Sequence, residues 1–431
     1  MIRISKFRIF LIIVMILTLL NTNSSSFAIL DEGKIAGSIS SDYYATSPVE
    51  YFNETKHPRY NLVARPIDLI IFPNKGRPVI ADFFENITIE INSTSSPSNW
   101  DLYLLNDENT IELEILDFYV NDESTMLNVH PTSNIEGLYD LQFNSTIGND
   151  YQTHSVKIVE EKEYPFKFLH ISDSHFPCYG ELNTTDICLK YIADIKNLDV
   201  DFAIFTGDII EGGPAWLFVD PITDKPLAAE IQLKLGLWAL DLLDMPIYII
   251  GGNHDLDYST IIPDIPREIW EKYLGKNNVI SFKFLDWLYV GYSATESGIT
   301  SSEYNYVKEI LGPAHQNNIP SILFYHSDYM NQATNLRKLY SIEVMLYGHE
   351  HHEELSVKAN TLYYCVDTMF NNASSVFTVL NGTSIKLKET MYDFSLLLQE
   401  TTKTSFSGLL ILLLTPIIVS CLKLKRRSRL D

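Results

Sequence analysis

Basic residues are scarce over most of this 431-residue sequence. Lysine and arginine number 32 against 55 aspartates and glutamates, which gives a net charge of −23. Eight of the bases and one of the acids lie in the two terminal segments, so the central part keeps 24 bases, 54 acids and a charge of −30. Such a body repels long nucleic acids, and no basic stripe offsets the repulsion. A nucleotide substrate is not excluded, because bound metal ions can dominate the local field.

Cysteine is also scarce, with four in the chain. Cys178 and Cys188 flank a short loop, where they either form a disulfide outside the cytosol or remain two unrelated thiols. Cys365 lies in an apolar strand pattern that favours a core position. Cys421 ends an apolar run, where a cysteine can be acylated.

The two ends of the chain have the pattern of targeting signals. Three bases precede an apolar run at 9–20, and Ser-Phe-Ala at 26–28 is similar to a cleavage site, which predicts a signal peptide over 1–28. An uncleaved anchor is the alternative. The uncharged run 406–422 is near the short limit for a transmembrane helix, and the basic tail 423–431 follows it at once. The positive-inside rule then predicts a single-pass membrane protein with an extracellular or lumenal body and a cytoplasmic C-terminus.

Seven Asn-x-Ser/Thr triplets after the predicted signal peptide are compatible with a secreted glycoprotein, although a chain rich in these residues forms several by chance. They begin at Asn53, Asn86, Asn92, Asn144, Asn183, Asn372 and Asn381.

Residues 29–160 are predicted to form the first domain, and from about residue 60 they carry the period-two pattern of short antiparallel strands. The run 87–91 alternates isoleucine with Thr88 and Glu90, and similar runs lie at 111–115 and 139–143. Such strands at regular spacing predict an all-β, immunoglobulin-like sandwich. No internal repeat is present, and a charged joint before residue 165 marks the domain boundary.

The pattern changes between residues 165 and 395, where apolar strands alternate with helix-length segments. Strands separated by helices predict an α/β domain with buried sheets, in which ligands collect beyond the carboxyl ends of the strands. The strands are expected at 166–171, 202–205, 246–250, 322–325 and 344–347, and the helices near 186–196, 228–243, 302–316 and 330–340.

Each of these strands is followed by residue types that bind metal ions. The blocks are Asp173-Ser174-His175, Gly207-Asp208, Gly252-Asn253-His254-Asp255, His326 and Gly348-His349-Glu350-His351. Charged and imidazole groups at five strand ends are costly unless solvated or paired, so stability alone does not explain them. Asp-x-His and His-x-His each place two ligands on one face of an extended segment. Carboxylate and imidazole donors without thiolate favour Mn, Fe or Zn.

The five blocks, complete and in this order, resemble the calcineurin-like metallophosphoesterase superfamily, whose motifs are D-x-H, G-D, G-N-H-D/E, H and G-H-x-H. The resemblance covers about 166–390. It implies an α/β (α+β) four-layer sandwich of two mixed sheets flanked by helices, here preceded by the all-β domain, and a site for two divalent or trivalent metal ions. By this resemblance one ion takes Asp173, His175, Asp208 and His351, and the other takes Asp208, Asn253, His326 and His349.

The resemblance also implies three candidate catalytic residues. His254 takes the family's non-ligand role, in which it stabilises phosphoryl charge and protonates the leaving oxygen; a helix-capping or core histidine is the alternative. Glu211 or Asp255 is expected to orient it, and an exposed acid at 211 is the alternative. His352 directly follows His351 and does not fit the His-x-His spacing, so it ranks below His351 as a metal ligand. His170 is expected in the core.

A β domain before an extracytoplasmic phosphoesterase is also similar, in part, to plant-type purple acid phosphatases. Those enzymes use a tyrosine ligand and lack the histidine of the Asp-x-His block. Here His175 is present, and Glu211 stands near the position of that tyrosine. No purple Fe(III)–tyrosinate chromophore is therefore expected.

Together these features predict hydrolysis of a small phosphomonoester or phosphodiester, lipid head groups included, with a metal-bridging hydroxide as the nucleophile. The alternative is a catalytically weak surface receptor or adhesin that retains the fold. The complete set of seven ligands argues against that alternative. The acidic body argues against a nuclease that acts on long nucleic acid.

Overall fold

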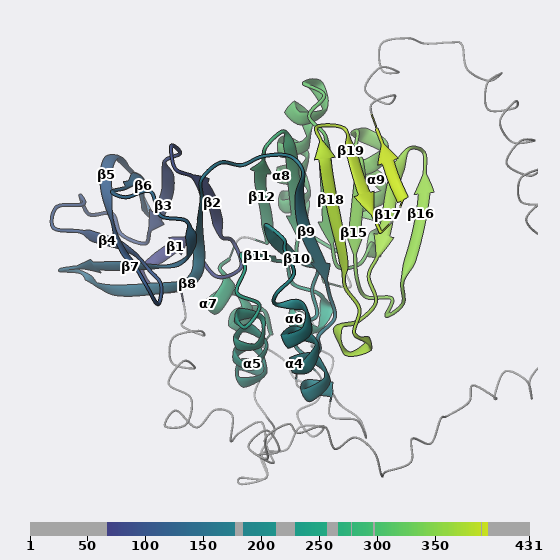
Figure 1. Cartoon of the computed structure of the whole chain (residues 1–431), viewed down its shortest axis with the longest axis horizontal. Helices are drawn as coiled ribbons and strands as arrows, with labels where there is room; N and C mark the ends of the chain where they lie inside the picture. The colour runs from purple at the N-terminus through teal and green to yellow at the C-terminus, as the bar shows by residue number, and fades with distance from the viewer. Residues whose placement is uncertain are drawn as a thin grey trace, which may run out of the picture. The chain divides into compact units, whose positions relative to one another are not determined.

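The computed structural model describes residues 67–176, 184–212, 229–256, 266–276, 278–295, 298–388 and 390–394 (Figure 1). All of them belong to one compact unit, residues 51–431. Over these ranges no helix has both the length and the apolar character to cross a membrane. The predicted signal peptide at 1–28, the span at 406–422 and the tail at 423–431 lie outside the described residues and stay predictions.

The elements between residues 67 and 159 are all strands, and they form one eight-stranded sheet in the order β1-β3-β6-β5-β4-β7-β8-β2. The strands are β1 (Ile70–Phe72), β2 (Val79–Asp82), β3 (Ile87–Ile91), β4 (Asp101–Leu105), β5 (Thr110–Val120), β6 (Thr125–Pro131), β7 (Gly137–Ser145) and β8 (Gly148–Val159). β5 links the two halves of the sheet, because its first three residues pair with β4 and the rest pairs with β6. Buried side chains from both halves share one core.

The period-two pattern decides which residues enter this core. In β3, Ile87, Ile89 and Ile91 are buried, while Thr88 is exposed. One pairing differs from the antiparallel prediction, since β2 runs parallel to β8. The sequence gives no signal for this pair, because the two strands lie far apart in the chain. The immunoglobulin-like assignment stays a prediction.

The following domain contains two six-stranded mixed sheets, in the orders β11-β10-β9-β18-β19-β20 and β12-β13-β14-β15-β17-β16. The first sheet consists of β9 (Phe166–Ile171), β10 (Phe202–Phe205), β11 (Ile247–Ile249), β18 (Ser375–Asn381), β19 (Ser384–Leu387) and β20 (Thr390–Asp393). The second consists of β12 (Val279–Phe284), β13 (Trp287–Tyr292), β14 (Ser321–Tyr325), β15 (Val344–Tyr347), β16 (Glu354–Lys358) and β17 (Thr361–Cys365). β9, β10 and β11 are parallel, as are β13, β14, β15 and β17.

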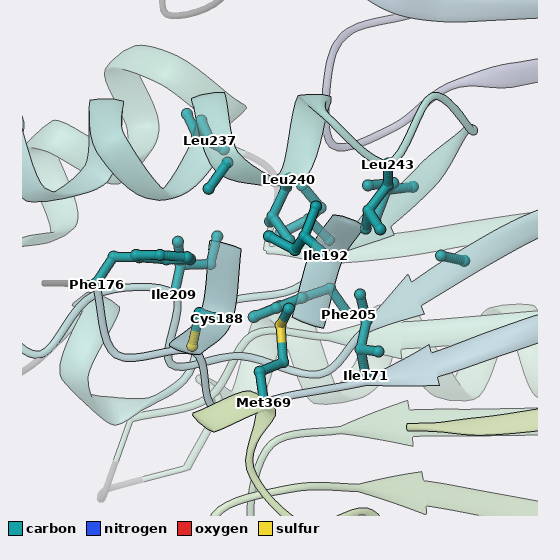
Figure 2. Packing of buried hydrophobic residues seen from close by; sticks show 14 of the residues in the cluster. Ile171, Phe176, Cys188, Ile192, Phe205, Ile209, Leu237, Leu240, Leu243 and Met369 are labelled. Carbon is teal, nitrogen blue, oxygen red and sulfur yellow. The ribbon is translucent and has the colours of Figure 1, made fainter. Parts of the chain in front are cut away.

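Successive side chains of a strand point to opposite faces of its sheet, and they therefore enter different core layers. Phe168 of β9 enters the core between the two sheets, where its ring lies 5.7 Å from that of Tyr289 of β13. Its neighbours Leu169 and Ile171 enter a different core, which they share with helices α4 and α5 (Figure 2). A third core joins the second sheet to α8 and α9. The domain therefore has the predicted order of helices, sheet, sheet and helices.

The helices confirm most of the predicted segments. They are α4 (Thr184–Ile195), α5 (Ala229–Asp241), α6 (Asn253–Leu256), α7 (Pro266–Leu274), α8 (Ser301–Gln316) and α9 (Gln332–Leu339), with the short 3-10 turns η3 (Tyr329–Asn331) and η4 (Met369–Asn371). α8 begins where Thr300 and Glu303 form a capping box. Helix α7 was not predicted, because only Trp270, Tyr273 and Leu274 of its nine residues enter the core.

The described cysteines are buried. Cys365 ends β17 in the interior, as predicted. Cys188 lies in α4, with its sulfur 3.6 Å from the carbonyl oxygen of Ser174. Cys178 lies outside the described residues, so its pairing with Cys188 stays a prediction.

Candidate metal centre

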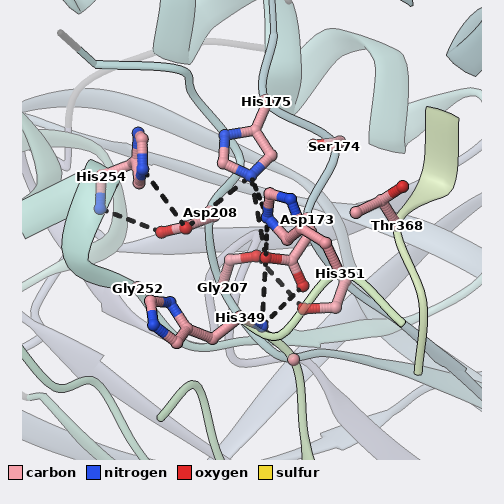
Figure 3. Close-up of polar contacts among 12 residues, drawn as sticks. Asp173, Ser174, His175, Gly207, Asp208, Gly252, His254, His349, His351 and Thr368 are labelled. Carbon is pink, nitrogen blue, oxygen red and sulfur yellow. Dashed lines mark hydrogen bonds and ion pairs between the residues drawn. The ribbon is translucent and has the colours of Figure 1, made fainter. Parts of the chain in front are cut away.

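The seven predicted metal ligands meet at the carboxyl ends of five strands. β9, β10 and β11 lie side by side in the first sheet, and β14 and β15 lie side by side in the second. Because each set is parallel, the segments that follow these strands emerge together. The side chains brought together are Asp173, His175, Asp208, Asn253, His326, His349 and His351. Figure 3 labels five of them: Asp173, His175, Asp208, His349 and His351.

Asp173, His175 and His351 form one group, with donor atoms within 4.8 Å of one another. The Nε2 atoms of His175 and His351 are 3.1 Å apart. Oδ1 of Asp173 lies 3.7 Å from the first of these nitrogens and 3.4 Å from the second. Asp173 and His175 are buried, whereas the side chain of His351 is 43% exposed. This group therefore opens toward solvent on the His351 side.

Asp208, His326 and His349 form another group of donor atoms within 4.8 Å. Nε2 of His326 lies 3.0 Å from Oδ2 of Asp208 and 3.1 Å from Oδ1 of Asn253. The other ring nitrogen of His326 lies 2.8 Å from the carbonyl oxygen of Thr206. That contact fixes Nε2 as the atom that faces the cluster.

Asp208 joins the two groups. Its Oδ2 lies 3.0 Å from His326 and 3.8 Å from Nε2 of His175, which belongs to the first group. This oxygen is buried, and imidazole nitrogens are the groups of the described residues that approach it, without hydrogen-bond geometry. A buried carboxylate oxygen needs charged or hydrogen-bonding partners. The surrounding oxygens and imidazole nitrogens fit a pair of cations with Asp208 between them.

The backbone around these donors is strained. Five of the seven have a left-handed φ: Asp173 (54°), His175 (47°), Asp208 (56°), His349 (72°) and His351 (51°). Such conformations cost residues other than glycine on the order of 1–3 kcal/mol each and cluster at functional sites. Close approach also requires glycine at 348, because a Cβ there would lie 2.3 Å from Oδ2 of Asp173. The local chain is therefore shaped around the donor atoms at a cost in stability.

The imidazoles keep the two buried aspartates ionised. Burial alone would raise the pKa of Asp208, but the charges of His326 and His254 outweigh it and hold the pKa below its usual range. The pKa of Asp173 is likewise lowered, since hydrogen bonds from His175 and His351 overcome its burial. Burial alone would lower the pKa of His326, yet the Asp208 carboxylate raises it to about 9. The cluster thus holds its carboxylates in the form that binds a cation.

His254 lies at the edge of this cluster, on the first turn of α6. Its backbone N–H donates to Oδ1 of Asp208 over 2.9 Å, and its Nε2 lies 4.0 Å from Oδ2 of the same residue. Its Nδ1 contacts the carbonyl oxygen of Glu211. The side chain is 18% exposed, so its outer edge can reach a bound substrate.

The two candidate orienting acids take different places. The carboxylate of Glu211 lies 3.0 Å from Nδ1 of His175, so its carbonyl oxygen, and not its side chain, contacts His254. The carboxylate of Asp255 is buried and accepts the backbone N–H groups of Asp208, Ile209, Ile210 and Gly252. Asp255 therefore shapes the loop that carries Asp208. Its expected role in orienting His254 stays a prediction.

Two aromatic residues at the cluster were not predicted. The hydroxyl of Tyr329 lies 2.7 Å from Nε2 of His349. Phe370 of η4 packs edge-on against His175 and His351, at ring-centre distances of 6.1 and 5.9 Å. Neither belongs to a recognisable motif, so no sequence signal could have singled them out.

The two other histidines weighed in the sequence analysis are His352 and His170. His352 is exposed, and its Nδ1 lies 2.8 Å from the carbonyl oxygen of Glu350. His170 is fully buried beneath the site, with its Nε2 3.0 Å from the hydroxyl of Thr206. Burial lowers the pKa of His170 to about 3, so the ring is neutral at ordinary pH.

Comparison with known proteins agrees with this geometry. Residues 166–353, which include all seven donors, match the profile of the calcineurin-like phosphoesterase family. This part of the chain is therefore similar to calcineurin-like phosphoesterase domains.

A curated relative shares a shorter stretch. The chain is 33% identical over 95 residues to the probable glycerophosphodiester phosphodiesterase GpdQ of Arcobacter nitrofigilis, over 20% of this chain and 29% of that protein. The chain thus spans less than a third of the relative's length. Among solved structures, PhoD gives a TM-score of 0.45 at 10% identity, over 74% of this chain and 84% of that one. GAP50, the anchor in the inner membrane complex of Plasmodium, gives a TM-score of 0.36 at 14% identity, over 54% of this chain and 87% of that one. These structural likenesses carry no argument about activity.

Proposed function

We propose that the calcineurin-like phosphoesterase domain at residues 166–353 hydrolyses small phosphoesters with two bound metal ions. The observation that carries the proposal is the position of the buried Oδ2 of Asp208 between two groups of donor atoms, 3.0 Å from Nε2 of His326 and 3.8 Å from Nε2 of His175. One ion would be held by Asp173, His175, Asp208 and His351, and the other by Asp208, Asn253, His326 and His349. When bound, such a pair activates water as the nucleophile and neutralises charge on the attacking and leaving oxygens.

His254 supplies the proton in this proposal. Its Nδ1 is held at the carbonyl oxygen of Glu211, and its Nε2 points toward the space beside Asp208. A histidine fixed in this way can stabilise phosphoryl charge and donate a proton to the leaving oxygen. The exposed edge of His351 marks the side from which a substrate reaches the two groups.

The substrate class follows from charge and from the curated relative. A central charge of −30 disfavours long nucleic acids, so a small monoester or diester is proposed. The curated relative is named a probable glycerophosphodiester phosphodiesterase, which supports a small phosphodiester.

Metal removal tests this function. Purified full-length chain, treated with a chelator, is expected to lose at least about 100-fold of its rate on nitrophenyl phosphate and bis(nitrophenyl) phosphate, because the ions supply several kcal/mol of charge stabilisation. Added Mn²⁺ should restore the rate, and mass spectrometry should find two ions per chain. An unchanged rate in metal-free protein would refute the proposal.

The body of the protein is proposed to lie outside the cytoplasm, anchored by residues 406–422. The support is the basic tail directly after that run and the bases before residues 9–20. The immunoglobulin-like form proposed for the first domain is supported by the single core shared by both halves of its sheet. In sealed cells, protease added from outside should digest the body; protection until lysis would contradict this orientation.

A further inference from the structure

Glu211 lies behind one of the metal-binding imidazoles. Its Oε2 is 3.0 Å from Nδ1 of His175, an ion-pair contact whose angles are not those of a hydrogen bond in this structure. The opposite nitrogen of that ring, Nε2, faces the cluster, 3.1 Å from Nε2 of His351 and 3.7 Å from Oδ1 of Asp173. Glu211 therefore contacts the nitrogen that points away from the ion position. No donor group formed by the described residues includes Glu211 itself.

The backbone of Glu211 is fixed on both sides. Its N–H donates to the carbonyl oxygen of Phe176 over 3.3 Å, beside the parallel bridge between Phe176 and Ile210. Its own carbonyl oxygen contacts Nδ1 of His254. A single residue thus reaches the outer nitrogens of two imidazoles, one through its carboxylate and one through its main chain. The rings of His175 and His254 lie edge to face, 4.7 Å apart.

A metal-binding imidazole must present an unprotonated nitrogen to the ion, and the hydrogen bond at the other nitrogen decides which one that is. A carboxylate is the strongest acceptor available for the outer N–H, and it also makes the ligand more basic. At 23% exposure, the carboxylate of Glu211 is sheltered enough for this contact to persist.

We propose that Glu211 is a positioning residue of the metal centre: its carboxylate holds the Nδ1–H of His175, so that the Nε2 lone pair faces the first ion, while its carbonyl oxygen sets the ring of His254. This rests on the proposed function, since it assumes that ions bind. It differs from the role expected from sequence, in which the acid at 211 oriented His254 alone.

The test is a titration of the full-length chain with Mn²⁺. Electron paramagnetic resonance measures the concentration of free Mn²⁺ and so gives the dissociation constants. Wild type, Glu211→Gln, Glu211→Ala and Glu350→Gln are compared. Glu350 is an exposed acid between two ligands, so its variant controls for the loss of one nearby charge. We expect one of two dissociation constants to rise about 10-fold in Glu211→Gln and up to about 100-fold in Glu211→Ala. The other constant, and both constants of Glu350→Gln, should stay at wild-type values.

The outcomes separate this inference from the function on which it rests. Wild type that binds fewer than two ions would refute the proposed function. Wild type that binds two ions, with unchanged constants in both Glu211 variants, would overturn the role of Glu211 alone. Thermal unfolding of the metal-free variants supplies the remaining readout. A lower midpoint together with weaker binding of both ions would assign Glu211 to folding and also overturn the proposal.

Discussion

Asp208→Asn is expected to lower the rate of nitrophenyl phosphate hydrolysis by about 1,000-fold or more, which corresponds to about 4 kcal/mol of transition-state stabilisation. Asp208 is the one donor within 4 Å of imidazole nitrogens from both described groups. Asparagine keeps the size of the side chain but replaces one oxygen with an N–H₂ group, which cannot bind a cation. Both ion positions should therefore weaken together.

The matched control is Asp244→Asn, the same substitution at a side chain that is 80% exposed. Asp244 has a left-handed φ of 53°, which asparagine tolerates. The Asp244→Asn variant should hydrolyse nitrophenyl phosphate at the wild-type rate. Near-complete activity in Asp208→Asn, measured with a folded protein by circular dichroism, would remove Asp208 from the centre and leave the two groups unconnected.

Gly252→Ala is also expected to cause a large loss of the rate of nitrophenyl phosphate hydrolysis, through steric clashes alone. A Cβ at this position would lie 2.1 Å from Oδ1 of Asp208, 2.7 Å from its backbone nitrogen and 2.8 Å from Cδ2 of His326. Contacts this short cannot be absorbed by a flexible side chain, because one partner is backbone. The loops after β10 and β11 must move apart, and a misplacement of about 1 Å can cost about 100-fold in rate. Steady-state kinetics measures the loss directly.

Gly312→Ala provides the comparison, because a Cβ at Gly312 of α8 would meet no atom within 4 Å. It should keep the wild-type rate and two bound ions. If Gly252→Ala behaved in the same way, the close approach of the two loops would have no importance for the centre.

Each predicted donor lies next to a strong local signal. A buried strand such as β9 or β10 is a short apolar run, and the polar residues after it stand out. The longer helices, α5 and α8 among them, were predicted from their helix-length segments between such strands. Prediction missed the nine-residue helix α7, and it missed a pairing between remote partners, the parallel pairing of β2 with β8.

The roles of the two acids show why the site could not be completed from the sequence. The resemblance implies that Glu211 or Asp255 orients His254 and does not decide between them. In the structure the carboxylate of Asp255 accepts the backbone N–H groups of residues 208 to 210 and of Gly252. The carboxylate of Glu211 lies against His175, 36 positions earlier in the chain.

The sequence by itself determined which residue types can bind the metal ions and the strand ends at which they stand, because strand pattern and motif are properties of consecutive residues. Only the tertiary structure decided which nitrogen of each imidazole faces inward, that Asp208 joins two groups, and that Tyr329 and Phe370 border them. These contacts join residues as far apart in the chain as His175 and Phe370. Chain packing sets such distances and orientations, and no local pattern records them.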